Sequence, residues 1–154
     1  MVYGLDVIVT LYQGQNGNIF NHIGIGATTG NNANQTFGAG PNSGIGLISP
    51  VPGHIRLDNG QPIATLTIPT TAAQDALVNA YNTAAANNSN YQYSLTSNSC
   101  VDHVRGGLNA AGINLPVLTV GSGRSRRQST LGQNTNLPNS LFDALSSLGT
   151  VVTF

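Results

Sequence analysis

The first part of the chain alternates apolar and polar residues in the manner of β-strands. Residues 5–12 carry a large apolar side chain at every second position and are rich in β-branched residues, a period typical of a half-buried strand. The dipeptide Asn16-Gly17 favours a hairpin turn, and residues 19–27 read as a second strand. Shorter strand candidates, separated by proline- and glycine-containing turns, are 35–38, 44–49, 54–57 and 63–68.

After Pro69 the pattern changes to a helical period. The segment 71–74 (Thr-Ala-Ala-Gln) has the spacing of a capping box, and apolar residues then recur every three or four positions until the asparagine-rich segment 87–90. A second amphipathic helix is predicted from about Cys100 to Ala111. Gly112 follows as a residue suited to end it.

The C-terminal part has weaker signals. Residues 121–136 are rich in Gly, Ser, Asn and Gln and predict a flexible loop. Asn139 is expected to cap a short last helix closed by Gly149, and residues 151–154 to add an edge strand. Without a repeat or an internal boundary, residues 1–154 are expected to form a single α+β domain, with an antiparallel sheet packed against helices.

The charge content narrows the possible functions. Only 6% of the 154 residues are charged, all of them arginine or aspartate, and the formal net charge is zero. This balance disfavours duplex DNA or an anionic membrane as partner. No apolar run approaches the ~18 residues of a membrane span, and residues 1–4 do not have the basic, apolar pattern that begins a signal peptide.

The single cysteine lies where chemistry is favoured. Cys100 falls in the first turn of a predicted helix, after the cap-type residues Ser97, Asn98 and Ser99. Backbone N–H groups and the helix dipole favour a thiolate there, and the same N–H groups can stabilise an oxyanion. The competing interpretation is a small buried residue, which is the ordinary role of a lone cysteine.

A cysteine nucleophile needs an imidazole base within hydrogen-bond reach. Of the three histidines, His22 is held on a strand beside Gly24 and Gly26, which leave open space over its ring. We therefore predict His22 as the base and His54, at the start of a short strand, as the first candidate to orient it. His103, three residues after the cysteine, is expected to be a surface or partly buried helix residue.

The chain resembles circularly permuted papain-like proteins, a group that includes permuted NlpC-type cell-wall peptidases and lecithin:retinol acyltransferase-like proteins. It resembles most the papain-like toxin domains at the C-termini of bacterial RHS-repeat proteins. The resemblance covers roughly residues 4–113. The matching pieces are Gly4-Leu5-Asp6, Asn21-His22-Ile23-Gly24-Ile25-Gly26, Thr36-Phe37-Gly38 with Pro41, Pro52-Gly53 with Ile55 and Asp58, and Tyr93, Leu95, Cys100, Val104, Leu108 and Gly112.

The chain departs from this family pattern at three positions. Ser99 stands where the family usually has asparagine, His103 where it has phenylalanine, and position 54 is not a fixed histidine. The third member of the site therefore stays open between His54, Asp58 and Asn98. Tyr93 is expected to line the pocket or to fill the core.

The resemblance implies a cysteine hydrolase that attacks an amide or ester carbonyl through an acyl-enzyme, without a cofactor or metal. It implies delivery into a target cell as part of a larger secreted RHS toxin, and a cognate immunity protein as partner. A peptidase, amidase or deamidase acting on a protein or peptide-like substrate is favoured. An acyltransferase or lipase of the same fold is the alternative.

Three other functions are weighed against this one. Cys100 and His103 give one ligand pair for a metal, whereas structural zinc normally shows two. Arg124, Arg126 and Arg127 lack the interleaved aromatics of a nucleic-acid site. A papain-like fold used only for binding, with a structural Cys100, is the strongest alternative outside enzymes.

Overall fold

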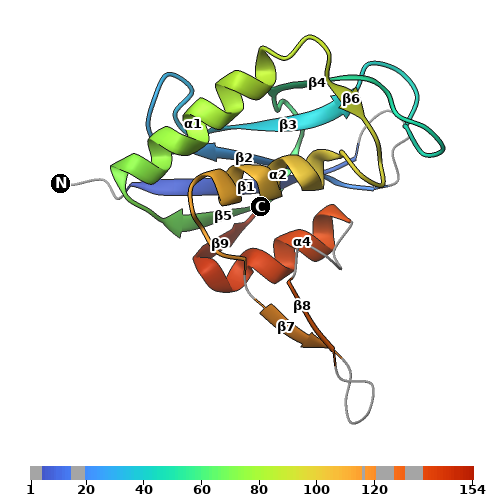
Figure 1. Ribbon diagram of the computed structural model, residues 1–154. Helices are drawn as coiled ribbons and strands as arrows, with labels where there is room; N and C mark the ends of the chain where they lie inside the picture. Colours follow the sequence, from blue (N-terminus) through green and yellow to red (C-terminus); the bar gives the residue numbers. More distant parts are fainter. Residues whose placement is uncertain (1–4, 15–19, 116, 121–126, 131–136) are drawn as a thin grey trace.

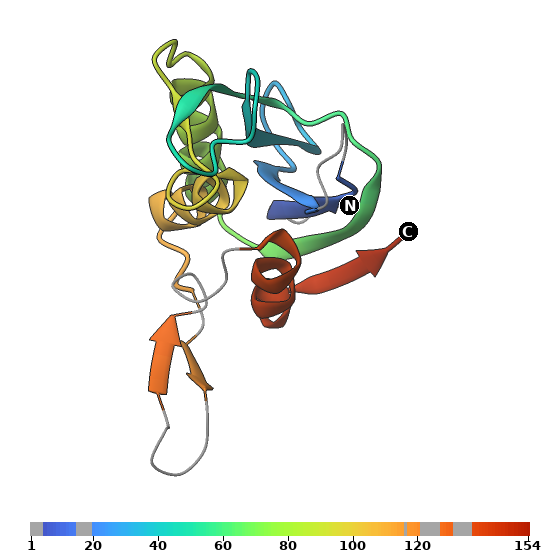
Figure 2. The ribbon, with the colours of Figure 1, turned by 90° about the vertical axis from the view of Figure 1, so that its right-hand side faces the viewer.

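The computed structural model describes residues 5–14, 20–115, 117–120, 127–130 and 137–154. These residues form an α+β fold in which a curved antiparallel sheet packs against helices (Figures 1 and 2). The sheet has seven strands in the order β6-β4-β3-β2-β1-β5-β9. Its strands are β1 (Asp6–Tyr12), β2 (His22–Ala27), β3 (Gln35–Pro41), β4 (Val51–Leu57), β5 (Pro62–Pro69), β6 (Gln92–Tyr93) and β9 (Thr150–Thr153).

The remaining elements flank this sheet. The helices are α1 (Ala72–Ala86), α2 (Cys100–Ala110) and α4 (Pro138–Leu145), and a short 3-10 helix η2 (Ser146–Leu148) follows α4. A separate antiparallel pair, β7 (Val117–Val120) and β8 (Arg127–Thr130), projects away from the main body (Figure 2). Thus β8 lies within the segment predicted as a flexible loop, and the rest of that segment, 121–126 and 131–136, is outside the described residues.

The helix starts follow from local hydrogen bonds. Thr71 and Gln74 form the capping box expected before α1, with Gln74 N donating to Thr71 Oγ1 over 3.2 Å and Thr71 N donating to Gln74 Oε1 over 3.0 Å. Ser99 and Asp102 form a second capping box at the start of α2. Gly112 adopts φ +69° after α2, a conformation suited to glycine.

One face of the sheet forms the core with the helices. Every second residue of the central strands is buried on this face, and α1, α2 and α4 contribute the matching apolar side chains. The fully buried members include Val7, Val9, Ile23, Ile25, Leu66, Val78, Val104, Leu108, Leu141 and Leu145. The alternation expected from the sequence therefore does set which strand face is buried.

Two local predictions are wrong. Residues 44–49 form no strand, because Gly44 and Gly46 adopt positive φ values that an extended strand does not use, and the segment exposes Ile45 and Ile48. Asn139 does not cap α4: Leu137 is the N-cap residue and makes no side-chain cap bond, while Pro138 occupies the first turn.

A buried amide ties α1 to both β2 and α2. Asn82, which is 1% exposed, donates from Nδ2 to the carbonyl of Ile25 over 3.0 Å, and its Oδ1 lies 2.9 Å from His103 Nε2. Burial lowers the pKa of His103 to about 4, so the ring is neutral and Nε2–H donates to Asn82. The ring also stacks on Tyr81 at 4.9 Å between centroids. His103 is thus a buried structural residue at 5% exposure, and the expectation of a surface or partly buried position is wrong.

We expect Asn82→Ala to destabilise the fold by about 2–4 kcal/mol, because it leaves the Ile25 carbonyl and His103 Nε2 buried without partners. Urea unfolding followed by circular dichroism measures this. Thr83→Ala, at the exposed neighbouring position of α1, is the matched control and should change stability by less than about 0.5 kcal/mol. Equal effects of the two substitutions would contradict this role for Asn82.

Candidate functional site

The candidate site is centred on His22, the first residue of β2. Its Nε2 lies 2.5 Å from Asp58 Oδ1, and the side chain of His22 is 27% exposed against 6% for Asp58. Asp58 follows directly after β4, so the bond joins residues 36 positions apart in the chain. The imidazole is therefore held at one end of the sheet with one edge accessible.

Glycines make room for this pair on the sheet face opposite the helices, here called the polar face. A Cβ at Gly38 would overlap His22 Nε2 and Asp58 Oδ1, and a Cβ at Gly24 would overlap Asp58 Oδ2. The space predicted beside His22 is therefore not open, because the carboxylate of Asp58 fills it. Larger residues at either glycine would displace the carboxylate or the ring.

Cys100 meets the same imidazole from the helix side. It is the first residue of α2, is 6% exposed and belongs to the edge of the apolar core. It lies close enough to the His22 ring to raise the pKa of that ring. The predicted nucleophile and the predicted base are therefore near each other, and Asp58 is bonded to Nε2 of the ring.

The charge state of His22 follows from these neighbours. Burial opposes the charged form, but the hydrogen bond to Asp58 and the interaction with Cys100 outweigh it and raise the pKa of His22 to about 10. The ring is thus an imidazolium at neutral pH, flanked by a carboxylate and a sulfur.

The second oxygen of Asp58 is also satisfied. Thr36 Oγ1 donates to Asp58 Oδ2 over 2.6 Å, and the backbone N–H of Asp58 donates to the carbonyl of Thr36 over 2.9 Å. Both carboxylate oxygens therefore have a partner, which fixes the orientation of the group. Asp58 was one of three sequence candidates for the third residue.

The other two candidates make different contacts. His54 lies on β4 opposite Gly40, and its Nδ1 bonds to Asn42 Oδ1 over 2.7 Å. The exposed Asn98 donates from its amide to the carbonyl of Gln92 over 2.6 Å. Neither side chain hydrogen-bonds to His22, so the expectation that His54 orients the base is replaced by Asp58.

Tyr93 lies close to the sulfur from β6. It is 6% exposed, and burial together with the nearby Cys100 and Asp102 raises its pKa to about 12. The phenol therefore stays protonated at neutral pH. Its position fits both sequence interpretations, as a core residue and as part of the surroundings of Cys100.

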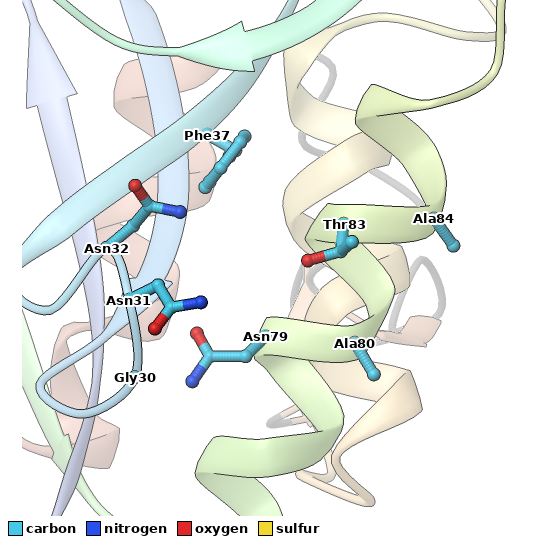
Figure 3. A pocket seen from close by; sticks show the side chains of 8 residues that line it. All are labelled: Gly30, Asn31, Asn32, Phe37, Asn79, Ala80, Thr83 and Ala84. Carbon is cyan, nitrogen blue, oxygen red and sulfur yellow. The ribbon is translucent and has the colours of Figure 1, made fainter.

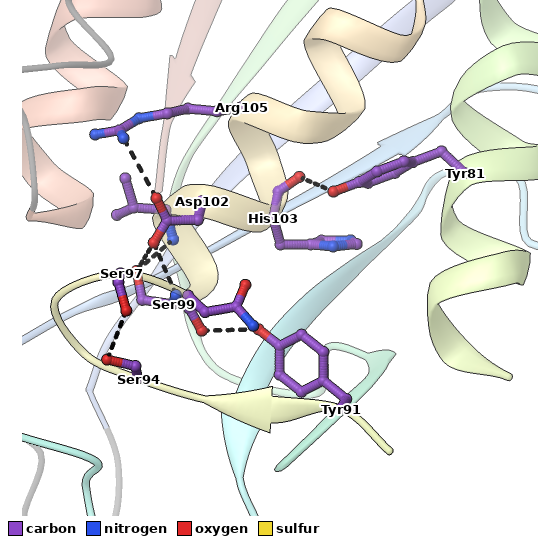
Figure 4. A network of polar contacts seen from close by, with 10 residues as sticks. Tyr81, Tyr91, Ser94, Ser97, Ser99, Asp102, His103 and Arg105 are labelled. Carbon is purple, nitrogen blue, oxygen red and sulfur yellow. Dashed lines mark hydrogen bonds and ion pairs between the residues drawn. The ribbon is translucent and has the colours of Figure 1, made fainter. Parts of the chain in front are cut away.

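The start of α2 is fixed by polar contacts of Ser99 and Asp102 (Figure 4). Asp102 Oδ2 accepts from the backbone N–H of Ser99 over 2.8 Å, and Asp102 Oδ1 lies 3.3 Å from Arg105 Nη1. Ser99 Oγ accepts from the N–H of Val101 over 3.2 Å. Ser99 thus serves as the N-cap of α2, directly before the cysteine.

Two surface hollows lie apart from this centre. The larger, about 520 Å³, lies between the β2–β3 connection and α1 and is lined by Asn31, Asn32, Phe37, Asn79 and Thr83 with Gly30, Ala80 and Ala84 (Figure 3). A second of about 310 Å³ is lined in part by Tyr81, Tyr91 and His103. Neither contains His22 or Cys100, and the first has no acidic or basic side chain.

Two further features of the described residues bear on the alternatives. No three His, Cys, Asp or Glu side chains among them are grouped so as to hold a metal ion. No helix in the described part of the chain has the length and apolar character needed to cross a bilayer.

Comparison with known proteins identifies the fold but not a sequence family. No protein-family model and no curated protein sequence matches the chain. A solved structure of the type VI secretion system effector TseH superimposes with a TM-score of 0.63, covering 99% of this chain and 94% of that chain at 9% identity. The chain shares the fold of this effector. The predicted α+β class, with an antiparallel sheet packed against helices, is confirmed.

The raised pKa of His22 predicts a pH-dependent stability. The stabilisation is complete below pH 6.5, the ordinary pKa of histidine, and is lost as the pH rises toward about 10. The free energy of unfolding should therefore fall between pH 7 and 10. Asp58→Asn should flatten this fall, because an amide holds an imidazolium less well than a carboxylate does.

Urea unfolding at several pH values measures this slope. His54→Gln is the matched control and should leave the slope unchanged. An unchanged slope in Asp58→Asn would show that Asp58 does not hold the charge on His22.

Proposed function

We propose that this chain is a toxin or effector domain that acts as a cysteine hydrolase, with Cys100 as nucleophile, His22 as base and Asp58 as the orienting residue. The observation that carries the proposal is the His22 ring, which meets Asp58 at Nε2 and interacts with the sulfur of Cys100. A nucleophile, a base and an orienter in this order are the parts of a triad. The resemblance to papain-like toxin domains supports the same assignment.

The chemistry begins from an ion pair, in which His22 already holds the proton of the Cys100 thiol. The thiolate attacks the carbonyl carbon of the substrate, and the imidazolium then donates its proton to the leaving amine or alcohol, which leaves a thioester on Cys100. Water, deprotonated by His22, attacks this thioester, and the thiolate leaves as the acid is released. Asp58 holds the ring in one orientation throughout.

An oxyanion formed on the carbonyl needs hydrogen-bond donors near the sulfur. Cys100 is the first residue of α2, and the N–H groups of a helix's first turn have no partner within the helix. Val101 N–H is used by the cap residue Ser99. We therefore assign the backbone N–H of Cys100 as an oxyanion donor.

We favour a protein or peptide-like substrate over a charged lipid headgroup. The enzyme would then be a peptidase, an amidase or a deamidase. The chain carries few charges and has a net charge of zero, and no cation other than His22 contacts Asp58 among the described residues. The buried Tyr93 near Cys100 supplies an uncharged wall.

The effector role is supported by the shared fold. The chain superimposes along nearly its whole length on a protein described as a type VI secretion system effector. Together with the RHS-type resemblance, this supports secretion within a larger toxin, delivery into a target cell and a cognate immunity protein.

The first test of this proposal is the reactivity of Cys100. Iodoacetamide should label it rapidly at pH 7, and His22→Ala should slow labelling by roughly 10²-fold because the imidazole no longer favours the thiolate. His54→Ala is the matched control and should label as the wild type does. Slow labelling of the folded wild type, with no dependence on His22, would instead indicate a binding module with a structural cysteine.

The second test is toxicity. Expression of the chain in the bacterial cytoplasm, and separately with an added export signal, should arrest growth in at least one compartment. Cys100→Ser should abolish the arrest while the protein accumulates to the same level. Equal toxicity of wild type and Cys100→Ser would contradict a hydrolase that uses this residue.

A further inference from the structure

A line of two hydroxyl groups leads across the polar face to Asp58. Thr36 Oγ1 donates to Asp58 Oδ2 over 2.6 Å, and Tyr12 OH lies 2.7 Å from Thr36 Oγ1. The line thus runs from β1 to β3 before it reaches the carboxylate.

Each hydroxyl has a single proton, so the first bond fixes the direction of the second. Thr36 gives its proton to Asp58 and can only accept from Tyr12. Tyr12 therefore donates to Thr36. Both O–H dipoles point toward Asp58, an arrangement in which one bond polarises the other.

The carboxylate needs this support because of where it lies. The side chain of Asp58 is 6% exposed, and His22 is its ionic partner among the described residues. A buried carboxylate with one cation is stable only when its remaining oxygens accept hydrogen bonds. Thr36, itself 2% exposed, supplies that bond.

We propose that Thr36 is a positioning residue of the site, and that the hydroxyl line behind it keeps the Asp58 carboxylate aligned with His22. The catalytic role given to Thr36 rests on the proposed function. Thr36 acts through Asp58 and does not touch the reacting atoms. Without its bond, Asp58 holds the imidazolium less firmly and the thiolate loses its counter-ion at a lower pH.

The line stays intact through the pH range in which His22 titrates. Burial raises the pKa of Tyr12 above its usual value of 10, and the nearby Asp58 acts in the same direction. The phenol therefore remains a donor while His22 is still protonated. A variant that breaks the line should show its effect on His22 within this range.

The test compares Thr36→Val, which removes the hydroxyl but keeps the shape, with Thr36→Ser, which keeps the hydroxyl. Proton NMR follows the titration of His22, and iodoacetamide labelling follows Cys100 as a function of pH. In Thr36→Val, both the titration of His22 and the alkaline decline of labelling should move to lower pH by about one unit. Thr36→Ser should titrate as the wild type does.

Two more variants complete the series. Tyr12→Phe, which removes the second link, should move the titration in the same direction by a smaller amount. Thr67→Val is the matched control, because Thr67 is on β5 and takes no part in the line. It should leave both curves unchanged.

If Thr36→Val and Tyr12→Phe lower thermal stability but leave the His22 titration where it is, Thr36 is a structural residue and the proposal is wrong. Should Thr36→Val not fold, an unshifted titration in Tyr12→Phe gives the same answer. The NMR titration does not depend on a reactive thiol. Slow, His22-independent labelling of the wild type would therefore overturn the proposed function separately.

Discussion

The candidate site depends on the short contact between His22 Nε2 and Asp58 Oδ1. This bond is 2.5 Å long and nearly excluded from solvent on the Asp58 side, so it fixes the ring and stabilises its positive charge against the effect of burial. Cys100 lies close to the same ring. Without Asp58, the imidazole would lie at the end of a strand with neither a defined orientation nor a stable charge.

The rest of the fold positions the side chains of His22, Asp58 and Cys100. The two faces of the sheet differ in kind: one packs apolar residues against three helices, while the other uses glycines to admit polar side chains between strands. Gly24 and Gly38 are thus part of the site although they carry no chemistry. The capping box of Ser99 and Asp102 plays the corresponding role for α2, because it sets where the helix begins and so where Cys100 points.

Local sequence patterns predicted the parts of this arrangement, and long-range pairing decided the rest. The strand of His22, the two longer helices and the helix start at Cys100 follow from periodicity and cap residues. The choice of Asp58 over His54 does not, because it depends on how β4 aligns with β3 and where the chain turns after Leu57. The short strand β6 gave no periodic signal, and the two left-handed glycines of residues 44–49 overrode an apolar pattern that resembles a strand.

The most direct test is the protonation state of His22 in the wild-type protein at pH 8, read from the ¹⁵N chemical shifts of its two ring nitrogens. Both nitrogens should carry protons, since the pKa of His22 is raised to about 10. Cys100→Ala and Asp58→Asn should each favour the neutral ring. A neutral His22 at pH 8 in the folded wild type, unaffected by either substitution, would contradict this prediction.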